Sequence, residues 1–578
     1  MKTKYIALAV SLLIGIGAFA QHNEEVTIEG AYRPKVNKVD KILMQPEKPQ
    51  QSFQMPNATT KVLDIDHRFP LELEKLSALG YNGKNGQTPE PTKNFLMAGI
   101  GSRISPLFLY KHNSNLTKNL GLGVGIKHYS SWLDIKDYAP SSFMNNAFEI
   151  GLTSGNNKNV QLGGNVYYKN DMVHYYGVNL EETPLTDAQI ETSCPRQVYN
   201  TIGGHFDLAS TSTRLGEVSH NGSVDYHYAF DKFGSQEHFL DVNYGLGYAQ
   251  SWWGDKSHPQ KLGFSFGAQY DGFAPAGAIE SRILFDVNPF FEVKGEFYRL
   301  HLGARVDGVY GEELNDPFFA VHPDLSGSLF VLNKKLEFYA GLNGGRHLVT
   351  FREAFEGNPF VLIHSQGEIQ AVKNEKLCFE GGVRTNIAEV VDLHLGVRYR
   401  HTDNDWFYQQ RRDASYEGSN LPYNCFGLVY DETRTVSVLA DMRLKLRGGF
   451  SADLGFAYNN YKMTKEECPW YRPAMEGKLK LNYDVNDNLA FNVSFLYQGG
   501  RYAKVWNNGP YWTAKYPLIY DVVQLKDVFD LSLGADYHFS DQLSVFVKLD
   551  NVLNQKYQLY YNYPVTGFQA FAGLKMSF

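Results

Sequence analysis

Apolar and polar residues alternate strictly along much of this chain, and the alternation continues to the last residue. Because successive side chains of a β-strand point to opposite faces, this pattern predicts strands with one apolar and one polar face. Leucine, tyrosine and valine alternate with lysine, asparagine and aspartate over 479–485, and the pattern resumes over 489–497 after a polar turn. The same alternation runs through 391–399 and 436–446. The chain is therefore predicted to be all-β.

A soluble β-sandwich would also alternate, but three features favour a transmembrane antiparallel β-barrel. Short polar turns such as 155–158 alternate with long aromatic connections such as 503–527, an asymmetry typical of outer-membrane barrels. The strands also follow one another without linkers, whereas separate sandwiches would be divided by domain boundaries. Finally, the last strand ends on an aromatic residue, and we interpret its apolar face as a C-terminal assembly signal: Leu574, Met576 and Phe578.

Counting hairpins from about residue 93 gives roughly 22 strands, and an even number returns both ends of the barrel to the same side. The 486 residues from 93 to 578 allow about 22 residues per strand and connection, which suffices for the ~9–11 that cross a membrane. If the last strand runs toward the periplasm, the long connections lie outside: 172–195, 346–373, 408–421, 463–472, 503–527 and 557–566.

The first twenty residues are predicted to be a signal peptide. Two lysines precede an apolar run that ends Ala18-Phe19-Ala20, the order that signal peptidase recognises. A membrane anchor is the alternative, but the run falls short of the ~20 apolar residues that a spanning helix needs. We therefore divide the chain into a signal peptide at 1–20, an extended periplasmic arm or vestigial plug at 21–92 and a barrel at 93–578, located in the outer membrane of a Gram-negative bacterium.

The sequence offers no support for nucleic-acid binding, and no common catalytic signature. Its net charge is −7 and it contains no basic block. It has no Gly-rich phosphate loop, no His-Glu-x-x-His and no Cys-x-x-Cys. We therefore predict no enzyme, no cofactor and no metal site. The catalytic alternative is a barrel lipase in which His394 or His538 pairs with a neighbouring serine.

Two segments resemble TonB-dependent receptors. The stretch 549–557, followed after a loop by 571–578, is similar to the last two strands of their barrels. Near the other end, 24–30 resembles the short box that precedes the plug of such receptors and is held by the energy-transducing protein TonB. The resemblance implies a partner-binding box, whose candidate residues are Glu25, Val26, Thr27, Ile28, Glu29 and Gly30. Other expected partners are outer-membrane lipid and the barrel-assembly machinery.

The arm at 21–92 has only 72 residues, fewer than the plug domain of these receptors, so the resemblance implies a plug-less member. Two functions stay open. The barrel is either a receptor or transporter for passage or capture of a solute, or a non-transporting platform that binds a periplasmic or surface partner. A barrel of this size would enclose a wide lumen. We expect either the arm, or inward-folded loops together with a partner, to fill it.

The polar face of the strands carries charges of both signs, which form either cross-strand ion pairs or a selective polar channel. The basic members are Arg398, Arg400, Arg443, Lys445, Lys478, Lys480, Lys548 and Lys575, and the acidic members are Asp392, Asp441, Asp453, Asp484, Asp530, Asp536 and Asp550. Tryptophans near the strand ends are interpreted as aromatic belts at the membrane interfaces: Trp132, Trp252, Trp253, Trp406, Trp470, Trp506 and Trp512.

Export would place the four cysteines in a compartment that permits disulfides. Successive connections alternate between the two ends of the barrel, and this alternation places both Cys425 and Cys468 at the outer rim. A Cys425–Cys468 disulfide is therefore predicted. Cys194 lies in another outer connection and could compete for either partner. Cys378 is expected in the middle of a strand, as a small buried residue.

Overall fold

The computed structural model describes residues 93–578 except 155–159, 211–214, 255–256, 276–278, 312–317, 364–367, 370–371, 388–389, 412–421, 423, 447 and 507–519. The predicted signal peptide, the arm at 21–92 and the box from Glu25 to Gly30 lie outside the described residues. What was predicted for them therefore stays a prediction.

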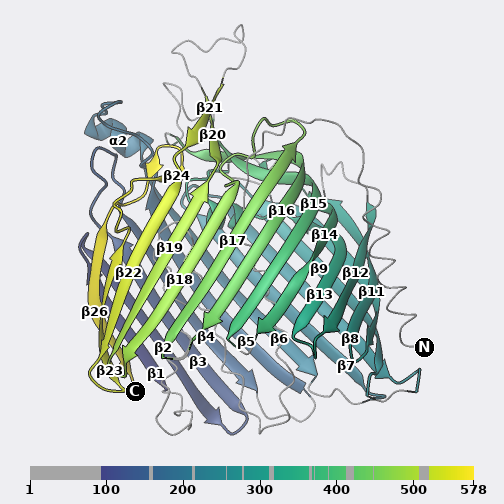
Figure 1. The fold of residues 1–578 in the computed structure, drawn as a ribbon. Helices are drawn as coiled ribbons and strands as arrows, with labels where there is room; N and C mark the ends of the chain where they lie inside the picture. The colour runs from purple at the N-terminus through teal and green to yellow at the C-terminus, as the bar shows by residue number, and fades with distance from the viewer. Residues whose placement is uncertain are drawn as a thin grey trace, which may run out of the picture. The chain divides into compact units, whose positions relative to one another are not determined.

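The described chain forms a closed antiparallel barrel of 22 strands (Figure 1), so the predicted fold class and strand number are confirmed. The barrel strands are β1 (Asn94–Gly101), β2 (Ser105–Thr117), β3 (Leu120–Ser131), β4 (Phe143–Ser154), β5 (Val160–His174), β6 (Arg196–Ser210), β7 (Val218–Asp231), β8 (Gln236–Gln250), β9 (Gln260–Ala274), β10 (Glu280–Lys294), β11 (Tyr298–Gly311), β12 (Phe319–Val331), β13 (Leu336–Leu348), β14 (Val372–Ile387), β15 (Val391–Gln410), β16 (Phe426–Lys445), β17 (Phe450–Met463), β18 (Met475–Asn486), β19 (Leu489–Gly499), β22 (Val528–His538), β23 (Leu543–Asp550) and β26 (Gln569–Ser577). Two short hairpins, β20 (Arg501–Trp506) with β21 (Tyr520–Leu525) and β24 (Gln558–Tyr560) with β25 (Tyr563–Pro564), and two short helices, α2 (Asp187–Ser193) and α3 (Phe351–Gly357), lie in the connections.

The first and last strands close the ring. β1 pairs with β26 from Phe95 opposite Ser577 to Gly101 opposite Phe571. The backbone N–H of Asn94 also donates to the carbonyl of Phe578 at 2.8 Å. Closure leaves no strand edge unpaired, as a sheet surrounded by hydrocarbon requires.

The two faces of the strands differ as the alternation predicts. On β15, Leu395 and Val397 are about half exposed on the outer surface, whereas Arg398 and Arg400 point to the other face and pair with Glu380 and Glu375 at 2.6 and 2.7 Å. An apolar exterior and a charged interior are what a barrel in a bilayer needs. These ion pairs support the interpretation that lumen charges brace neighbouring strands.

The apolar side chains at the C-terminus are on the outer surface of the last strand. Leu574, Met576 and Phe578 are 47%, 40% and 52% exposed. Their role in assembly stays a prediction.

The two ends of the barrel are unequal, as predicted. We call the end with the long connections the loop end; it carries α2, β20, β21 and β24 (Figure 1). At the opposite end, the turn end, neighbouring strands are joined by short connections such as 332–335 between β12 and β13. Neither helix in the described part of the chain reaches the length and hydropathy needed to span a bilayer.

The largest hydrophobic cluster includes many side chains from the loop end. It contains Trp406 and Trp470, both almost completely buried. The interpretation of these two residues as interface belts is therefore wrong, because they pack inside the protein. Trp132, Trp252 and Trp253 are exposed, as a belt requires, and Trp512 lies outside the described residues.

The barrel predicts a depth-dependent cost for charge on its outer surface. Leu395 lies in the middle of the apolar stretch of β15, so Leu395→Arg is expected to lower the free energy of unfolding by about 2–4 kcal/mol. Val485 is similarly exposed but lies next to the end of β18, so Val485→Arg should cost only about 0–1 kcal/mol. Equilibrium unfolding in phospholipid vesicles measures both. Equal costs would contradict the membrane-spanning placement.

Candidate functional site

The connection between β13 and β14 spans residues 349–371. Its described residues, 349–363, 368 and 369, fold into the barrel at its loop end, and we call them the inner loop. Its described residues contact β5, β6, β8, β10, β15 and β16 through hydrogen bonds or ring stacking. In the ring of 22 strands, β6 and β15 lie nine places apart. A segment that touches both must therefore cross the lumen.

The inner loop begins with α3, whose first turn is capped from the barrel wall. Thr350 is the N-cap, and its hydroxyl accepts from the backbone N–H of Glu353 at 3.1 Å. The Glu237 carboxylate of β8 accepts from the backbone N–H groups of Phe351 and Arg352. Glu237 is fully buried, and a carboxylate is buried only where such donors compensate its lost hydration.

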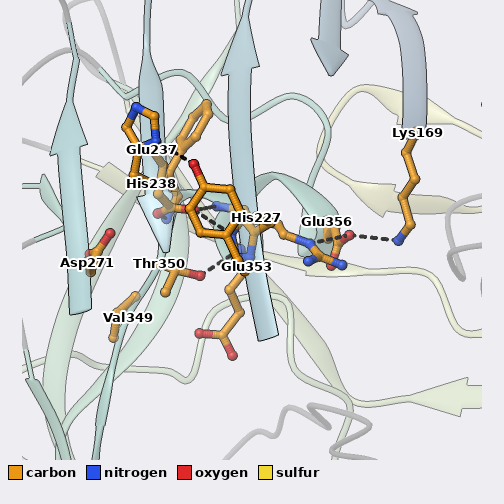
Figure 2. Close-up of polar contacts among 12 residues, drawn as sticks. Lys169, His227, Glu237, His238, Asp271, Val349, Thr350, Glu353 and Glu356 are labelled. Carbon is orange, nitrogen blue, oxygen red and sulfur yellow. Dashed lines mark hydrogen bonds and ion pairs between the residues drawn. The ribbon is translucent and has the colours of Figure 1, made fainter. Parts of the chain in front are cut away.

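His227 on β7 supports this cap. Its Nε2 lies 3.1 Å from Oε2 of Glu237, and both side chains lie in the barrel wall beside the start of the inner loop (Figure 2). The Glu237 carboxylate thus joins two strands to the backbone of α3. This arrangement fixes where the inner loop enters the lumen.

Arg282 on β10 holds the beginning and the later part of the inner loop together. Its Nη2 donates to the carbonyl of Val349 at 2.8 Å, and its Nη1 donates to the carbonyl of Ile369 at 2.7 Å. The guanidinium is also paired with the buried Asp271 of β9. One rigid, planar group with several donors is suited to such multiple contacts.

A second charged contact lies on the β5 side of the lumen. Glu356 pairs with Arg352 at 3.0 Å and with Lys169 of β5 at 3.1 Å, and Arg352 donates to the hydroxyl of Tyr167 at 2.8 Å. Burial by itself would raise the pKa of Glu356, but the charges of Arg352 and Lys169 hold that pKa well below its ordinary value. Glu356 is therefore a carboxylate at neutral pH, and it joins α3 to β5.

Aromatic packing fills the space between these polar contacts. Phe355 stacks on Tyr199 of β6 with ring centroids 4.3 Å apart, and Phe351 packs against Phe273 of β9 at 5.4 Å. On the opposite side, the Tyr408 hydroxyl of β15 donates to a carbonyl of α3 at 2.8 Å. Phe351 and Phe355 are almost completely buried.

Beyond α3, the inner loop runs beside the start of β16 and meets another connection. Leu362 N–H donates to the Phe426 carbonyl at 2.8 Å, and Phe426 N–H donates to the Phe360 carbonyl at 2.9 Å. Phe360 also stacks on Tyr563 of β25 at 3.7 Å. The inner loop and the 557–566 connection thus form one aromatic layer inside the loop end.

The cysteines singled out from the sequence are not among the charged side chains that anchor the inner loop. Cys425 is buried in the aromatic cluster and Cys468 packs against it, so both lie at the loop end as predicted. No disulfide joins the four cysteines. The Cys425–Cys468 pairing stays a prediction.

His394 does not form the pair that a lipase would require. Its Nε2 lies 2.6 Å from the Tyr339 hydroxyl and its Nδ1 lies 3.1 Å from Asp441. These partners make it part of the polar lumen wall. The sequence predicts the long connection 346–373 and offers inward-folded loops as one alternative for filling the lumen, but no sequence signal identifies Glu237 and Arg282 as anchors.

Comparisons with known proteins support the fold. No family model and no curated protein match the sequence. Among solved structures, P. aeruginosa FpvA bound to heterologous pyoverdines has a TM-score of 0.60 at 13% identity, with 84% of this chain and 72% of that chain covered. The ferric-catecholate import receptor Fiu of E. coli K12 has a TM-score of 0.58 at 9% identity, with 84% of this chain and 82% of that chain covered.

The iron transporter FrpB of Neisseria meningitidis is similar to the same extent, with a TM-score of 0.59 at 12% identity and with 84% of this chain and 81% of that chain covered. The barrel therefore has the fold of TonB-dependent receptor barrels, as the sequence resemblance predicts.

Removing the Glu237 carboxylate should loosen the inner loop. Glu237→Ala leaves two backbone N–H groups and His227 without their buried acceptor, and breaking such a buried network costs about 3–5 kcal/mol. We expect the variant to open conducting channels in planar bilayers more often than the wild type. Asp441→Ala removes a lumen carboxylate that contacts His394 instead, and is the matched control. Equal conductance in all three proteins would contradict a seated loop.

Aromatic packing should control how often the inner loop opens. Phe355→Ala removes the stack on Tyr199, and the loss of a buried phenylalanine costs about 3–5 kcal/mol. Amide hydrogen exchange of residues 350–363 should therefore become at least about a hundredfold faster, while exchange in the barrel strands stays the same. Phe379→Ala, on the exposed outer surface, should leave the loop's exchange unchanged.

Proposed function

We propose that the protein is an outer-membrane receptor or transporter-like barrel that captures a solute at the loop end or passes it across the membrane. The observation that carries this proposal is the inner loop, which crosses the lumen of a 22-stranded barrel. The sides of the barrel are apolar outside and charged inside, which suits an aqueous path through lipid. The loop end faces outward in this proposal, and the turn end faces the periplasm.

The class of solute is taken from the structural relatives. FpvA is described as bound to pyoverdines, Fiu as a ferric-catecholate import receptor and FrpB as an iron transporter. Ferric chelates are therefore the first solutes to test. The outer-membrane lipid and the barrel-assembly machinery are the proposed general partners, and TonB or another periplasmic protein would engage the box from Glu25 to Gly30.

A non-transporting platform is the second candidate. It is favoured by the depth to which the inner loop is buried, because Phe351, Phe355 and Val361 are almost completely inaccessible and an inner loop held in this way occupies part of the lumen. Under this alternative the barrel would anchor a periplasmic or surface partner without passing a solute.

Uptake from a panel of radioactive ferric chelates separates the two candidates. Cells that produce the protein should accumulate iron from at least one chelate, whereas control cells without it should not. Deletion of 22–92 should abolish this uptake if the arm engages TonB. Failure of every chelate, together with unchanged entry of large antibiotics when 350–363 is replaced by a short Gly-Ser linker, would favour the platform.

A further inference from the structure

Three side chains with metal-ligand chemistry converge where β15 and β16 extend above the apolar surface. They are His401 and Asp403 of β15 and Glu432 of β16. One donor atom from each, an imidazole nitrogen and two carboxylate oxygens, lies within 4.8 Å of the others. Among the described residues, no other three such side chains converge in this way.

The convergence differs from the other clusters of histidine with two carboxylates. His205 meets Asp225 through Nδ1 and Asp207 through Nε2. His301 likewise meets Glu292 and Asp324 through opposite ring nitrogens. Opposite nitrogens point in opposite directions, so those carboxylates cannot share one ion with the ring. In both clusters each ring nitrogen faces its own carboxylate, as in an imidazole that is hydrogen-bonded to two acceptors.

The strand irregularity at this point produces the convergence. The pairing of β15 with β16 shifts register between Thr402 and Asp405, and Asn404 adopts a positive φ of 49°. Such a bulge interrupts the hydrogen-bond ladder and redirects side chains. His401 and Asp403, two residues apart, consequently both lie beside Glu432.

The cluster is placed at the boundary of the apolar surface. On β15 the exposed apolar residues Leu395 and Val397 precede His401 on the same face, and on β16 Val436 and Val438 follow Glu432 on that face. Alternation therefore puts His401 and Glu432 on the outside of the barrel, just beyond the hydrocarbon and at the depth of the polar headgroups, and Asp403 lies beside them.

The present contacts of the cluster leave donor capacity. Glu432 is 2.7 Å from His401 and 3.5 Å from Arg434, and Asp403 is 2.6 Å from Lys376. The second oxygen of Asp403, Oδ1, is covered but makes no hydrogen bond. A covered carboxylate oxygen without a partner is energetically costly, and a cation would satisfy it.

We propose that His401, Asp403 and Glu432 form a binding site for one divalent transition metal of the Zn²⁺ class. One imidazole and two carboxylates are a donor set that Zn²⁺ accepts, and three protein ligands leave the fourth tetrahedral position for a water or another oxygen donor. The ion would join β15 to β16 where their ladder is interrupted.

Zinc titration of the untagged, chelator-treated full-length protein in detergent tests the proposal, with isothermal calorimetry as the readout. The wild type should bind about one Zn²⁺ per protein molecule at its highest-affinity site. His401→Ala and Glu432→Gln should each weaken that binding by at least about tenfold. His205→Ala removes a histidine whose two carboxylate partners lie at opposite ring nitrogens. This variant should bind Zn²⁺ as the wild type does.

A second measurement guards against misfolded variants. The temperature at which the barrel loses its compact gel mobility should rise with Zn²⁺ in the wild type and in His205→Ala, because a ligand that binds only the folded state stabilises it. It should not rise in His401→Ala or Glu432→Gln, whose mobility without Zn²⁺ reports whether they have folded. Absence of tight binding in the wild type, or equal binding by folded His401→Ala, would overturn the proposal.

Discussion

The structure depends on one requirement: each backbone N–H and C=O inside a bilayer needs a partner, and only the neighbouring strands can supply it. The pairing of β1 with β26 satisfies this requirement by closing the sheet. Once the ring has 22 strands, the barrel is wide. Closing the sheet therefore leaves a wide lumen, and the inner loop occupies part of it.

Two kinds of contact hold the inner loop, and their magnitudes suggest different roles. Burial of an aromatic side chain such as Phe351 or Phe355 contributes about 1.5–3 kcal/mol. A partly exposed ion pair such as Lys169 with Glu356 contributes about 0–1 kcal/mol. Each buried aromatic side chain therefore contributes more to seating the loop than this partly exposed ion pair does. The charged groups on β5, β8 and β10 determine where it sits, since each accepts only a few positions of its partner.

Much of the fold could be predicted because it depends on local alternation. Two-residue periodicity places Leu395 and Arg398 on opposite faces whatever the rest of the chain does. The path of the inner loop could not be predicted in this way, because Glu237 precedes its partner Phe351 by 114 residues. Trp470 was misinterpreted for a related reason: position near a strand end does not reveal whether a ring turns toward lipid or toward another loop. The His401 cluster was missed because its ligands come from two strands and converge only through a bulge.

The seam between β1 and β26 also has a consequence for how the protein is made. Asn94 and Phe578, which meet there, are separated by 484 positions in the chain. Every other strand can pair with a neighbour as soon as that neighbour follows it, but this last ladder must wait for the final residue. Until then the growing sheet has two unpaired edges, which are templates for association with other chains. The ladder that joins the most distant parts of the chain is thus the one on which the closed barrel relies.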